Sequence, residues 1–230
     1  MSTWRDFWNQ DTPIYASERH RALHYRGVAD DVLAFVPSPD AAVLDHGCGE
    51  ALEADRVAKA CSRLYLCDGA PLVRERLAER FRAVPKIEVL APEALADLPD
   101  ASLDLVVANS LVQYLSRAEL DSTLRLWHAK LKPGALLVVA DVIPPDVSPL
   151  TDAAALLRFG WRGGFLVAAL TGLARTALSD YRKLRARLGL AHYTGSGMLG
   201  ILERAGFAAE RRESNMGHNP ARMTFTARRI

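Results

Sequence analysis

Short runs of apolar and β-branched residues alternate with longer segments of helical periodicity between about residue 41 and residue 141. The first pattern is typical of buried strands and the second of amphipathic helices. Strands are expected at residues 41–45, 63–68, 86–90, 103–108 and 135–141, and helices at residues 50–60, 71–83 and 117–130. This alternation predicts βαβ units and a parallel sheet that helices cover on both faces.

The segments on either side of this region follow other patterns. A helical period covers residues 18–35, and a second helix is expected near residues 198–205, where Gly206 supplies a stop signal. Two more strands are expected at residues 207–213 and 222–229. Because their connection is too short for a crossover helix, these two strands should pair antiparallel.

Together the patterns predict an α/β fold in three layers, α/β/α, with a seven-stranded, mostly parallel sheet closed by an antiparallel C-terminal hairpin. A chain of 230 residues, 50% of them hydrophobic, suits one domain spanning residues 1–230. We expect this domain to carry an N-terminal helical segment at residues 1–40. A helical insertion, or lid, is expected at residues 146–192, where the alternation of strands and helices is interrupted.

Composition narrows the class of protein further. The N-terminal sequence has charged and aromatic residues where an export signal needs an apolar run, so a cytoplasmic location is expected. Cys48, Cys61 and Cys67 follow neither a disulfide nor a metal pattern, which predicts buried, reduced thiols and no metal site. The net charge of +2 hides an asymmetry, because residues 151–230 hold 13 basic and 5 acidic side chains.

This basic C-terminal part has several interpretations. It can mark an anionic ligand, an acidic partner, a membrane surface or a solvated face. The sequence has no zinc finger, no RNA-binding signature and no basic stripe with interleaved aromatics, so nucleic acid is not an expected partner. No apolar run is long enough for a membrane span, but residues 158–187 combine basic and apolar side chains in a way that allows peripheral contact with a membrane.

The most informative stretch for chemistry is residues 43–51, in which a buried strand runs into a turn with Gly47 and Gly49 and then toward a helix. Glycines at such a turn permit unusual backbone angles and let a ligand lie close to the main chain. The helix that follows offers unpaired N–H groups to polar or anionic ligand atoms. Taken alone, a Gly-x-Gly turn is a weak signal.

A second apolar strand, residues 64–67, ends in Asp68 and strengthens this signal. A carboxylate at the tip of the second strand accepts hydrogen bonds from both hydroxyls of a ribose, as in adenosine-containing cofactors. The alternative is that Asp68 only caps the helix that starts near Pro71.

Four stretches carry a resemblance to a known family: Leu-Asp-His-Gly-Cys-Gly at residues 44–49, the strand that ends in Asp68, Pro-Asp-Ala-Ser-Leu-Asp-Leu-Val-Val-Ala-Asn at residues 99–109, and Leu-Lys-Pro-Gly-Ala-Leu-Leu-Val-Val at residues 131–139. Through them, residues 41–141 resemble the class I S-adenosylmethionine-dependent methyltransferases. The resemblance implies a Rossmann-like fold and S-adenosylmethionine as the cofactor.

The resemblance also implies which residues bind the cofactor. The turn at residues 47–49 would contact the amino acid part, Asp68 the ribose, and Asn109 would lie near the methyl-donor end. The complete implied set is Asp45, Gly47, Cys48, Gly49, Asp68, Gly69, Glu93 and Asn109. The chain departs from the family in two places, because Ala51 stands where a third glycine is common, and Glu93 substitutes for an Asp that often lies beside the adenine.

Two other functions are compatible with part of this pattern. An NAD(P)-dependent oxidoreductase shares the glycine turn and the ribose carboxylate. Against it, Leu52 stands where the last glycine of the dinucleotide motif belongs, Asp45 precedes the turn, and the last two strands should be antiparallel. A non-catalytic relative that binds S-adenosylmethionine stays open as an alternative.

The acceptor side is less defined by the sequence. A base is needed when the methyl acceptor is a hydroxyl or an acidic carbon, and the first candidates are Asp141, Tyr114, His192 and Tyr193. His20, His24 and His218 are further candidates, although a structural role is the better expectation for any single histidine. The apolar and basic segment at residues 148–190 predicts a lid over a small, hydrophobic or amphiphilic acceptor. A static helical insertion would give the same composition.

Overall fold

The computed structural model describes residues 8–9, 15–178 and 189–230. Predictions that involve residues 1–7, 10–14 and 179–188, including the basic side chains at positions 182–187, lie outside the described residues.

The described residues form a seven-stranded sheet in the order β3-β2-β1-β4-β5-β7-β6. The strands are β1 (Ala42–His46), β2 (Arg63–Cys67), β3 (Ile87–Leu90), β4 (Leu103–Asn109), β5 (Leu131–Val142), β6 (Phe207–Arg211) and β7 (Met223–Arg229). The first five run parallel, whereas β7 pairs antiparallel with both β5 and β6. The predicted fold class, with its antiparallel closing hairpin, is therefore confirmed.

The order of the strands determines where a ligand crevice can form. The chain builds β2 and β3 on one side of β1, then crosses to build β4 and β5 on the other side. At such a switch point the loops that follow the two central strands diverge, which opens a crevice at the carboxyl ends of the strands. In this chain the crevice lies beyond the ends of β1 and β4.

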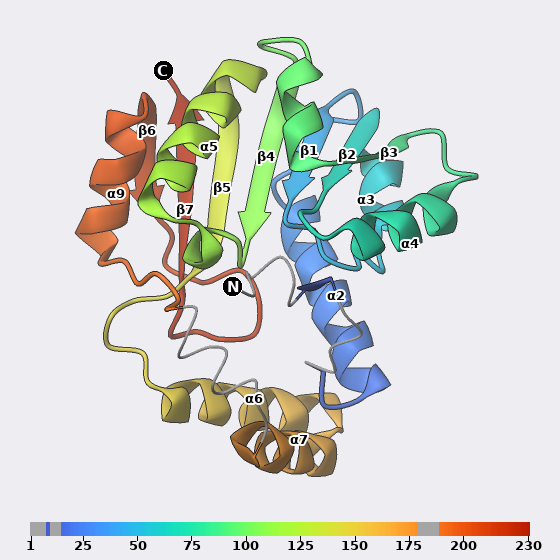
Figure 1. Cartoon of the computed structure of the whole chain (residues 1–230), viewed down its shortest axis with the longest axis vertical. Coiled ribbons are helices and arrows are strands. Elements are labelled where there is room, and N and C mark those ends of the chain that lie inside the picture. The colour runs from blue at the N-terminus through green and yellow to red at the C-terminus, as the bar shows by residue number, and fades with distance from the viewer. Residues whose placement is uncertain (1–7, 10–14, 179–188) are drawn as a thin grey trace.

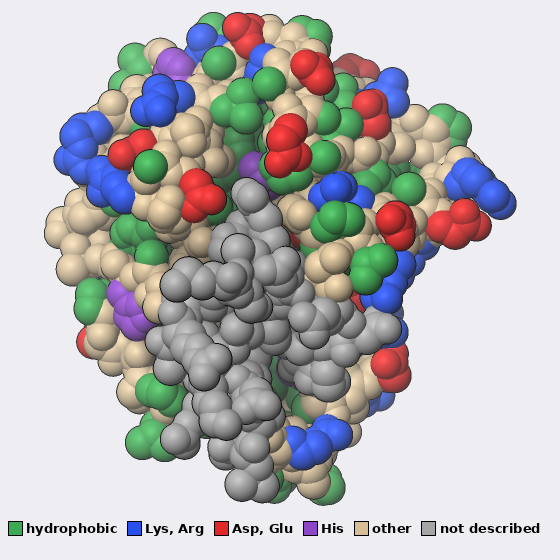
Figure 2. All heavy atoms as spheres, in the orientation of Figure 1, with side chains coloured by type: hydrophobic (Ala, Val, Ile, Leu, Met, Phe, Trp, Pro, Cys, Tyr) green, Lys and Arg blue, Asp and Glu red, His purple; other side chains and the backbone are tan. Residues whose placement is uncertain are grey.

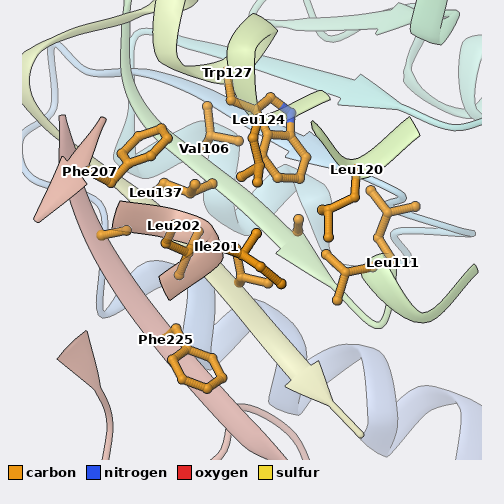
Figure 3. Packing of buried hydrophobic residues seen from close by; sticks show 14 of the residues in the cluster. Val106, Leu111, Leu120, Leu124, Trp127, Leu137, Ile201, Leu202, Phe207 and Phe225 are labelled. Carbon is orange, nitrogen blue, oxygen red and sulfur yellow. The ribbon is translucent and has the colours of Figure 1, made fainter. Parts of the chain in front are cut away.

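Helices cover both faces of the sheet (Figure 1). They are α2 (Glu18–Leu33), α3 (Ala54–Ala60), α4 (Pro71–Phe81), α5 (Arg117–Lys130) and α9 (Gly195–Arg204), with short 3₁₀ turns η1 (Pro92–Asp97) and η2 (Val112–Tyr114). Trp127, Phe207 and Phe225 dominate the core between α5, α9 and the sheet (Figure 3). A second core, with Val57 and Leu77, lies on the opposite face.

The start of α3 differs from the expectation. The sequence pattern predicts a helix from residue 50, but the helix begins at Ala54. Ala51 adopts a left-handed backbone with φ of +41°, and an α-helix cannot pass through that conformation. The turn after β1 therefore extends further than its glycines suggest.

The segment between β5 and α9 contains two helices, α6 (Pro149–Gly163) and α7 (Leu166–Leu178). They form a pair joined at Gly164, whose left-handed conformation (φ +70°) ends α6. Figure 1 shows the pair beyond the carboxyl ends of β4 and β5. None of the helices in the described part of the chain has the length and apolar character needed to cross a membrane.

Candidate functional site

A cleft of about 340 Å³ lies at the carboxyl edge of the sheet. It is lined from the tips of four parallel strands, from α2 and from the loop between β6 and β7. The lining residues that matter below are Tyr15, His20, His24, Tyr25, Asp45, Gly47, Cys48, Gly49, Asp68, Asn109, Ser110, Gln113, Tyr114, Asp141, His218 and Arg222. The cleft thus contains eight of the twelve predicted site residues, drawn from distant parts of the chain.

The turn after β1 forms one wall of the cleft. Gly47 and Gly49 have φ of +82° and +56°, in the left-handed region that glycine tolerates best. The N–H groups of Gly47 and Cys48 both donate to the carbonyl of Cys67, which ties the turn to the end of β2. A Cβ atom at Gly49 would lie 2.9 Å from the hydroxyl oxygen of Tyr25. A side chain at position 49 would therefore collide with Tyr25, so the packing requires glycine here.

Asp68 joins the turn to the start of α4. Its Oδ2 accepts a hydrogen bond from the Gly49 N–H (3.0 Å), and its Oδ1 accepts one from the Ala70 N–H (2.8 Å). Asp68 thus lies in the cleft, but it does not cap α4, because the N-cap residue is Ala70 and no side chain makes a capping hydrogen bond there. Burial raises the pKa of Asp68, and these two backbone hydrogen bonds oppose that rise. Because each carboxylate oxygen can accept two hydrogen bonds, Asp68 retains acceptor capacity toward the cleft.

Asp45 lies beside Asp68 and lines the same wall. Burial, assisted by the neighbouring Asp68 carboxylate, raises the pKa of Asp45 to about 7. Two neighbouring acidic side chains in one wall disfavour the binding of an anionic ligand group there. They favour the hydroxyl or amine groups of a ligand instead.

The tips of β4 and β5 form the adjacent wall. Ser110 and Asp141 both have φ of +56°, which is rare for residues other than glycine. The hydroxyl of Ser110 donates to Oδ2 of Asp141 (2.7 Å). Next to them, the Oδ1 atom of Asn109 is buried and accepts no hydrogen bond. Strained residues and an unsatisfied acceptor at one edge are typical of a site that is completed by a ligand.

Aromatic and histidine side chains cover the far end of the cleft. His20 stacks on Phe165, with ring centroids 4.9 Å apart, and His218 stacks on Phe159 at 4.8 Å. Tyr15 contacts His20 at 5.4 Å between ring centroids. These rings come from the segment around α2, from the α6–α7 pair and from the β6–β7 loop. Tyr15, His20 and His218 line the cleft and the phenylalanine rings support them, which gives this end of the cleft a planar, largely uncharged lining.

Four predicted site residues are placed differently. His192 and Glu93 are exposed, Glu93 on η1, and Gly69 directly follows Asp68. Tyr193 packs against the core, and its hydroxyl donates to the carbonyl of Val112 (3.4 Å). All four, Gly69, Glu93, His192 and Tyr193, lie outside the described lining of the cleft.

Sequence reasoning missed Tyr15 and Tyr25. The signal available was the helical spacing of His20 and His24, four positions apart, which predicts that both lie on one face of a helix together with their aromatic neighbours. Within the described residues, no group of three His, Cys, Asp or Glu side chains is arranged to hold a metal ion.

Parts of this chain are similar in sequence to known methyltransferases. A family model described as a methyltransferase domain matches residues 44–139, from β1 to β5. An uncharacterized methyltransferase of Mycobacterium tuberculosis (strain ATCC 25618 / H37Rv) is 31% identical over 126 residues, covering 54% of this chain and 61% of the relative. The trans-aconitate 2-methyltransferase of Azoarcus sp. (strain BH72) is 37% identical over 145 residues, covering 60% of this chain and 51% of the relative.

The chain therefore spans about half to three fifths of the length of these relatives. Among solved structures, the magnesium protoporphyrin IX methyltransferase of Synechocystis PCC 6803 superposes with a TM-score of 0.61 at 16% identity, covering 99% of this chain and 93% of that chain. A methyltransferase from Mesorhizobium loti gives a TM-score of 0.59 at 18% identity, covering 89% and 100%. At such low identities these structures show the shared fold alone.

Proposed function

We propose that this chain is a class I S-adenosylmethionine-dependent methyltransferase and that it transfers a methyl group from S-adenosylmethionine to a small, apolar or amphiphilic acceptor. The observation that carries the proposal is the convergence of three features on one cleft. These are the left-handed glycine turn, the carboxylate of Asp68 and the unsatisfied Oδ1 of Asn109.

The residues present fit the cofactor. The bare backbone at residues 47–49 would accommodate its amino acid part, and Asp68 would accept hydrogen bonds from its ribose hydroxyls. The buried Oδ1 of Asn109 would gain the partner that it lacks. When bound, S-adenosylmethionine supplies a sulfonium methyl group that is already strongly electrophilic.

The chain's own contribution is then mainly to hold the acceptor. In an in-line displacement, keeping the nucleophile close to and aligned with the methyl carbon supplies much of the acceleration. The walls formed by Ser110, Asp141 and Tyr114 on one side and by α2 on the other would orient the acceptor. Enclosure by aromatic rings would also exclude water from the reacting atoms.

The lining favours an uncharged acceptor. Arg222 is the one Lys or Arg among the described residues that line the cleft. Its guanidinium Nη2 contacts both carboxylate oxygens of Asp152, each at 2.8 Å, and so its charge is already neutralised. A polyanionic acceptor, of the kind that the name of the Azoarcus relative indicates, would lack a free cation here. We therefore favour a planar, neutral or amphiphilic molecule.

A small molecule is also favoured over nucleic acid. On the face shown in Figure 2, outside the grey atoms, basic and acidic side chains are interspersed. The described part of this face thus offers no uniform basic stripe of the kind that tracks a phosphate backbone.

We further propose that the outer face of the α6–α7 pair contacts an anionic membrane surface. Four large apolar side chains are exposed there: Leu150 (81%), Trp161 (75%), Val167 (75%) and Leu170 (51%). Arg158, Arg162 and Arg175 are exposed on the same pair of helices. Apolar side chains with flanking arginines favour insertion at the level of lipid headgroups. An amphiphilic acceptor could then enter the cleft from the bilayer.

Two measurements test the proposed reaction. Calorimetric titration with S-adenosylhomocysteine should show binding, whereas NADP should not bind. Incubation of the full chain with isotope-labelled S-adenosylmethionine and a cell metabolite extract should then transfer label to an extract component, identified by mass. Cofactor binding without transfer would instead favour a non-catalytic relative, and preferential NADP binding would favour an oxidoreductase.

A further inference from the structure

The loop between β6 and β7, residues 212–222, is hydrogen-bonded to three separate elements. The Gly217 N–H donates to Oδ2 of Asp31 on α2 (2.8 Å). The Asn219 side chain donates to Oδ1 of Asp152 on α6 (2.9 Å), and Oδ1 of Asn215 accepts the N–H of Asp141 at the tip of β5 (3.2 Å). A loop held at so many points has little conformational freedom.

Hydrogen bonds within the hairpin stiffen the loop further. The Asn215 side chain donates to the carbonyl of Asn219 (3.0 Å), and the N–H of Met216 donates to Oγ1 of Thr224 (2.9 Å). Gly217 has φ of +95°, a conformation that other residues rarely adopt. The backbone on both sides of His218 is therefore fixed, and the His218 ring is presented to the cleft from a rigid support.

The ring of His218 is also held by its neighbours. It stacks on Phe159 with an interplanar angle of 15°, and it makes T-shaped contacts with the rings of His20 and His24, each at 6.3 Å between centroids. Asp141, strained and hydrogen-bonded to Ser110, lines the same cleft. An imidazole and a carboxylate thus face the cleft from neighbouring supports.

The three histidines at this end of the cleft differ in their ability to take a proton. Nδ1 of His20 accepts the N–H of Ala16 (3.1 Å), so that lone pair is occupied, and burial lowers the pKa of His20 to about 4. Burial, assisted by the facing rings of His218 and His20, also lowers the pKa of His24 to about 4.

His218 has a different set of neighbours. The His218 side chain is partly exposed to solvent, but the groups packed around its ring desolvate it and so lower its pKa. The Arg222 guanidinium lowers this pKa further, whereas the carboxylates of Asp141 and Asp152 oppose both effects. Asp31 of α2 accepts the N–H of Gly217 in the same loop. Among the three histidines, His218 is therefore the one whose protonated form is supported by facing carboxylates.

We propose that His218 is the proton acceptor for an acceptor molecule with a nucleophilic hydroxyl, phenolic or enolic, and that Asp141 is a positioning residue that stabilises the resulting imidazolium. This inference rests on the proposed methyltransferase function and assigns it to O-methylation. As the oxygen–methyl bond forms, the hydroxyl proton passes to His218, the methyl–sulfur bond breaks and its electron pair stays on sulfur. The imidazolium then releases the proton to water, since His218 is exposed.

The first experiment measures the pairing without relying on activity. The full chain with ¹⁵N-labelled histidines and saturating S-adenosylhomocysteine is titrated by NMR, and the His218 signal is assigned by its loss in His218→Gln. We expect His218 to have the highest pKa of the three cleft histidines, and Asp141→Asn to lower that pKa by about 1. An Asp141→Asn variant with an unchanged His218 pKa would overturn the pairing.

The second experiment measures proton transfer. Label transfer from S-adenosylmethionine to a cell metabolite extract is compared in wild type, His218→Gln and His128→Gln, the last being the same substitution on α5 outside the cleft. His218→Gln should lower the transfer rate near pH 7 by about 10²–10⁴-fold and recover toward pH 10, where the hydroxyl ionises unaided. Its affinity for S-adenosylhomocysteine should be unchanged, and His128→Gln should behave as wild type.

The outcomes separate the two levels of the proposal. Loss of transfer that is equal at every pH, or a labelled product methylated on nitrogen or carbon, would overturn the role of His218 while leaving the methyltransferase function intact. Absence of transfer in wild type would overturn the proposed function itself. In that case the NMR titration still decides whether His218 and Asp141 are paired.

Discussion

Three of the residues that build the cleft edge have a left-handed backbone without being glycine. They are Ala51, Ser110 and Asp141, with φ of +41°, +56° and +56°. Each such residue costs about 1–2 kcal/mol relative to an ordinary conformation. The three residues lie where the strands β1, β4 and β5 lead into their loops. Their left-handed conformations direct the turn of residues 47–49 and the Asp141 carboxylate toward the cleft.

The Gly49 position allows a test with a matched control. Gly49→Val should destabilise the fold through the left-handed backbone and, because its Cβ would lie 2.9 Å from the Tyr25 hydroxyl, should also abolish binding of S-adenosylhomocysteine. Gly134 has a φ of +76°, but a Cβ atom there would have no neighbour within 4 Å. Gly134→Val should therefore carry a similar backbone cost and bind normally in calorimetric titration. Normal binding by folded Gly49→Val would show the glycine to be purely structural.

The Asp68 carboxylate gives a second residue-level prediction. Asp68→Ala should weaken S-adenosylhomocysteine binding by about 1.5–3 kcal/mol, the range for a hydrogen bond that involves a charged group. It should also lower the melting temperature, because the N–H groups of Gly49 and Ala70 lose their acceptor. Asp55→Ala, an exposed carboxylate paired with Lys59 across one helical turn, is the control for both measurements. If Asp68→Ala lost stability but kept full affinity, Asp68 would be a helix-start residue alone.

Local sequence patterns predict the parts of the cleft that local geometry creates. Gly47, Gly49 and Asp68 each lie at the end of an apolar strand, and the carboxyl ends of parallel strands necessarily meet at one edge. The sequence could not distinguish His218 from His20 or His24, because His218 is placed by contacts from Gly217 to Asp31 and from Asn219 to Asp152. Such long-range hydrogen bonds leave no trace in spacing or periodicity.

At the scale of whole elements, type and order can be predicted better than ends. The pattern of β5 predicts a strand from residue 135, whereas the strand extends from Leu131, directly after α5. Pro133 and Gly134 interrupt the apolar run there, so the apolar pattern predicts a shorter strand than the one that forms. Conversely, the helix predicted at residues 117–130 begins and ends where α5 does, and a Ser116–Glu119 capping box stabilises its start.

The sequence predicts that the segment containing the α6–α7 pair acts as a lid. In the structure, one of the apolar residues of this segment is buried, which limits the use of substitutions to test the prediction. Phe165 is only 5% exposed and stacks on His20, so replacing it by Ser would disturb the packing as well as acceptor contacts. Hydrogen exchange avoids this problem. Amides of residues 149–178 should exchange quickly in the free protein and more slowly with S-adenosylhomocysteine and an acceptor bound, while β4 and β5 stay protected. Equal protection in all ligand states would indicate a static insertion.

The exposed apolar face of the same pair gives a prediction about membranes. The full chain should cosediment with vesicles that contain anionic phosphatidylglycerol but not with vesicles of phosphatidylcholine alone. Trp161→Ser should reduce this binding, because Trp161 is 75% exposed among arginines. Ile230→Ser removes a similarly exposed apolar side chain from the opposite end of the molecule (Figure 1) and should have no effect. Equal binding by both variants would contradict docking through α6 and α7.

For the whole molecule, buried histidines determine the response to acid. Burial lowers the pKa of His46 to about 4, and its Nδ1 accepts the indole N–H of Trp127 (3.0 Å). Between pH 6.5 and 4 the unfolded chain therefore binds a proton that the folded chain does not, so the free energy of unfolding falls as the pH falls. The effect of His46 is at most about 3 kcal/mol, at 1.36 kcal/mol for each pKa unit.

Substitution of His46 tests this dependence. His46→Asn keeps an acceptor for the indole but cannot titrate, so its melting temperature should fall less between pH 6.5 and 4.5 than that of wild type. Asp45, whose pKa is raised to about 7, acts in the opposite direction, because its folded form retains a proton in this window. Parallel curves of melting temperature against pH for wild type and His46→Asn would exclude His46 as a source of acid sensitivity.

The long-range hydrogen bonds of the β6–β7 loop affect the order in which parts of the molecule fold. The hydrogen bond from Gly217 to Asp31 joins residues 186 positions apart, and the one from Arg222 to Asp152 joins residues 70 apart. Contacts of such separation form only after much of the chain has already been ordered, since closing long loops is entropically costly. During synthesis, the glycine turn and Asp68 emerge long before the hairpin that carries His218. The two sides of the cleft are thus synthesised at different times, and the side that carries His218 is completed last.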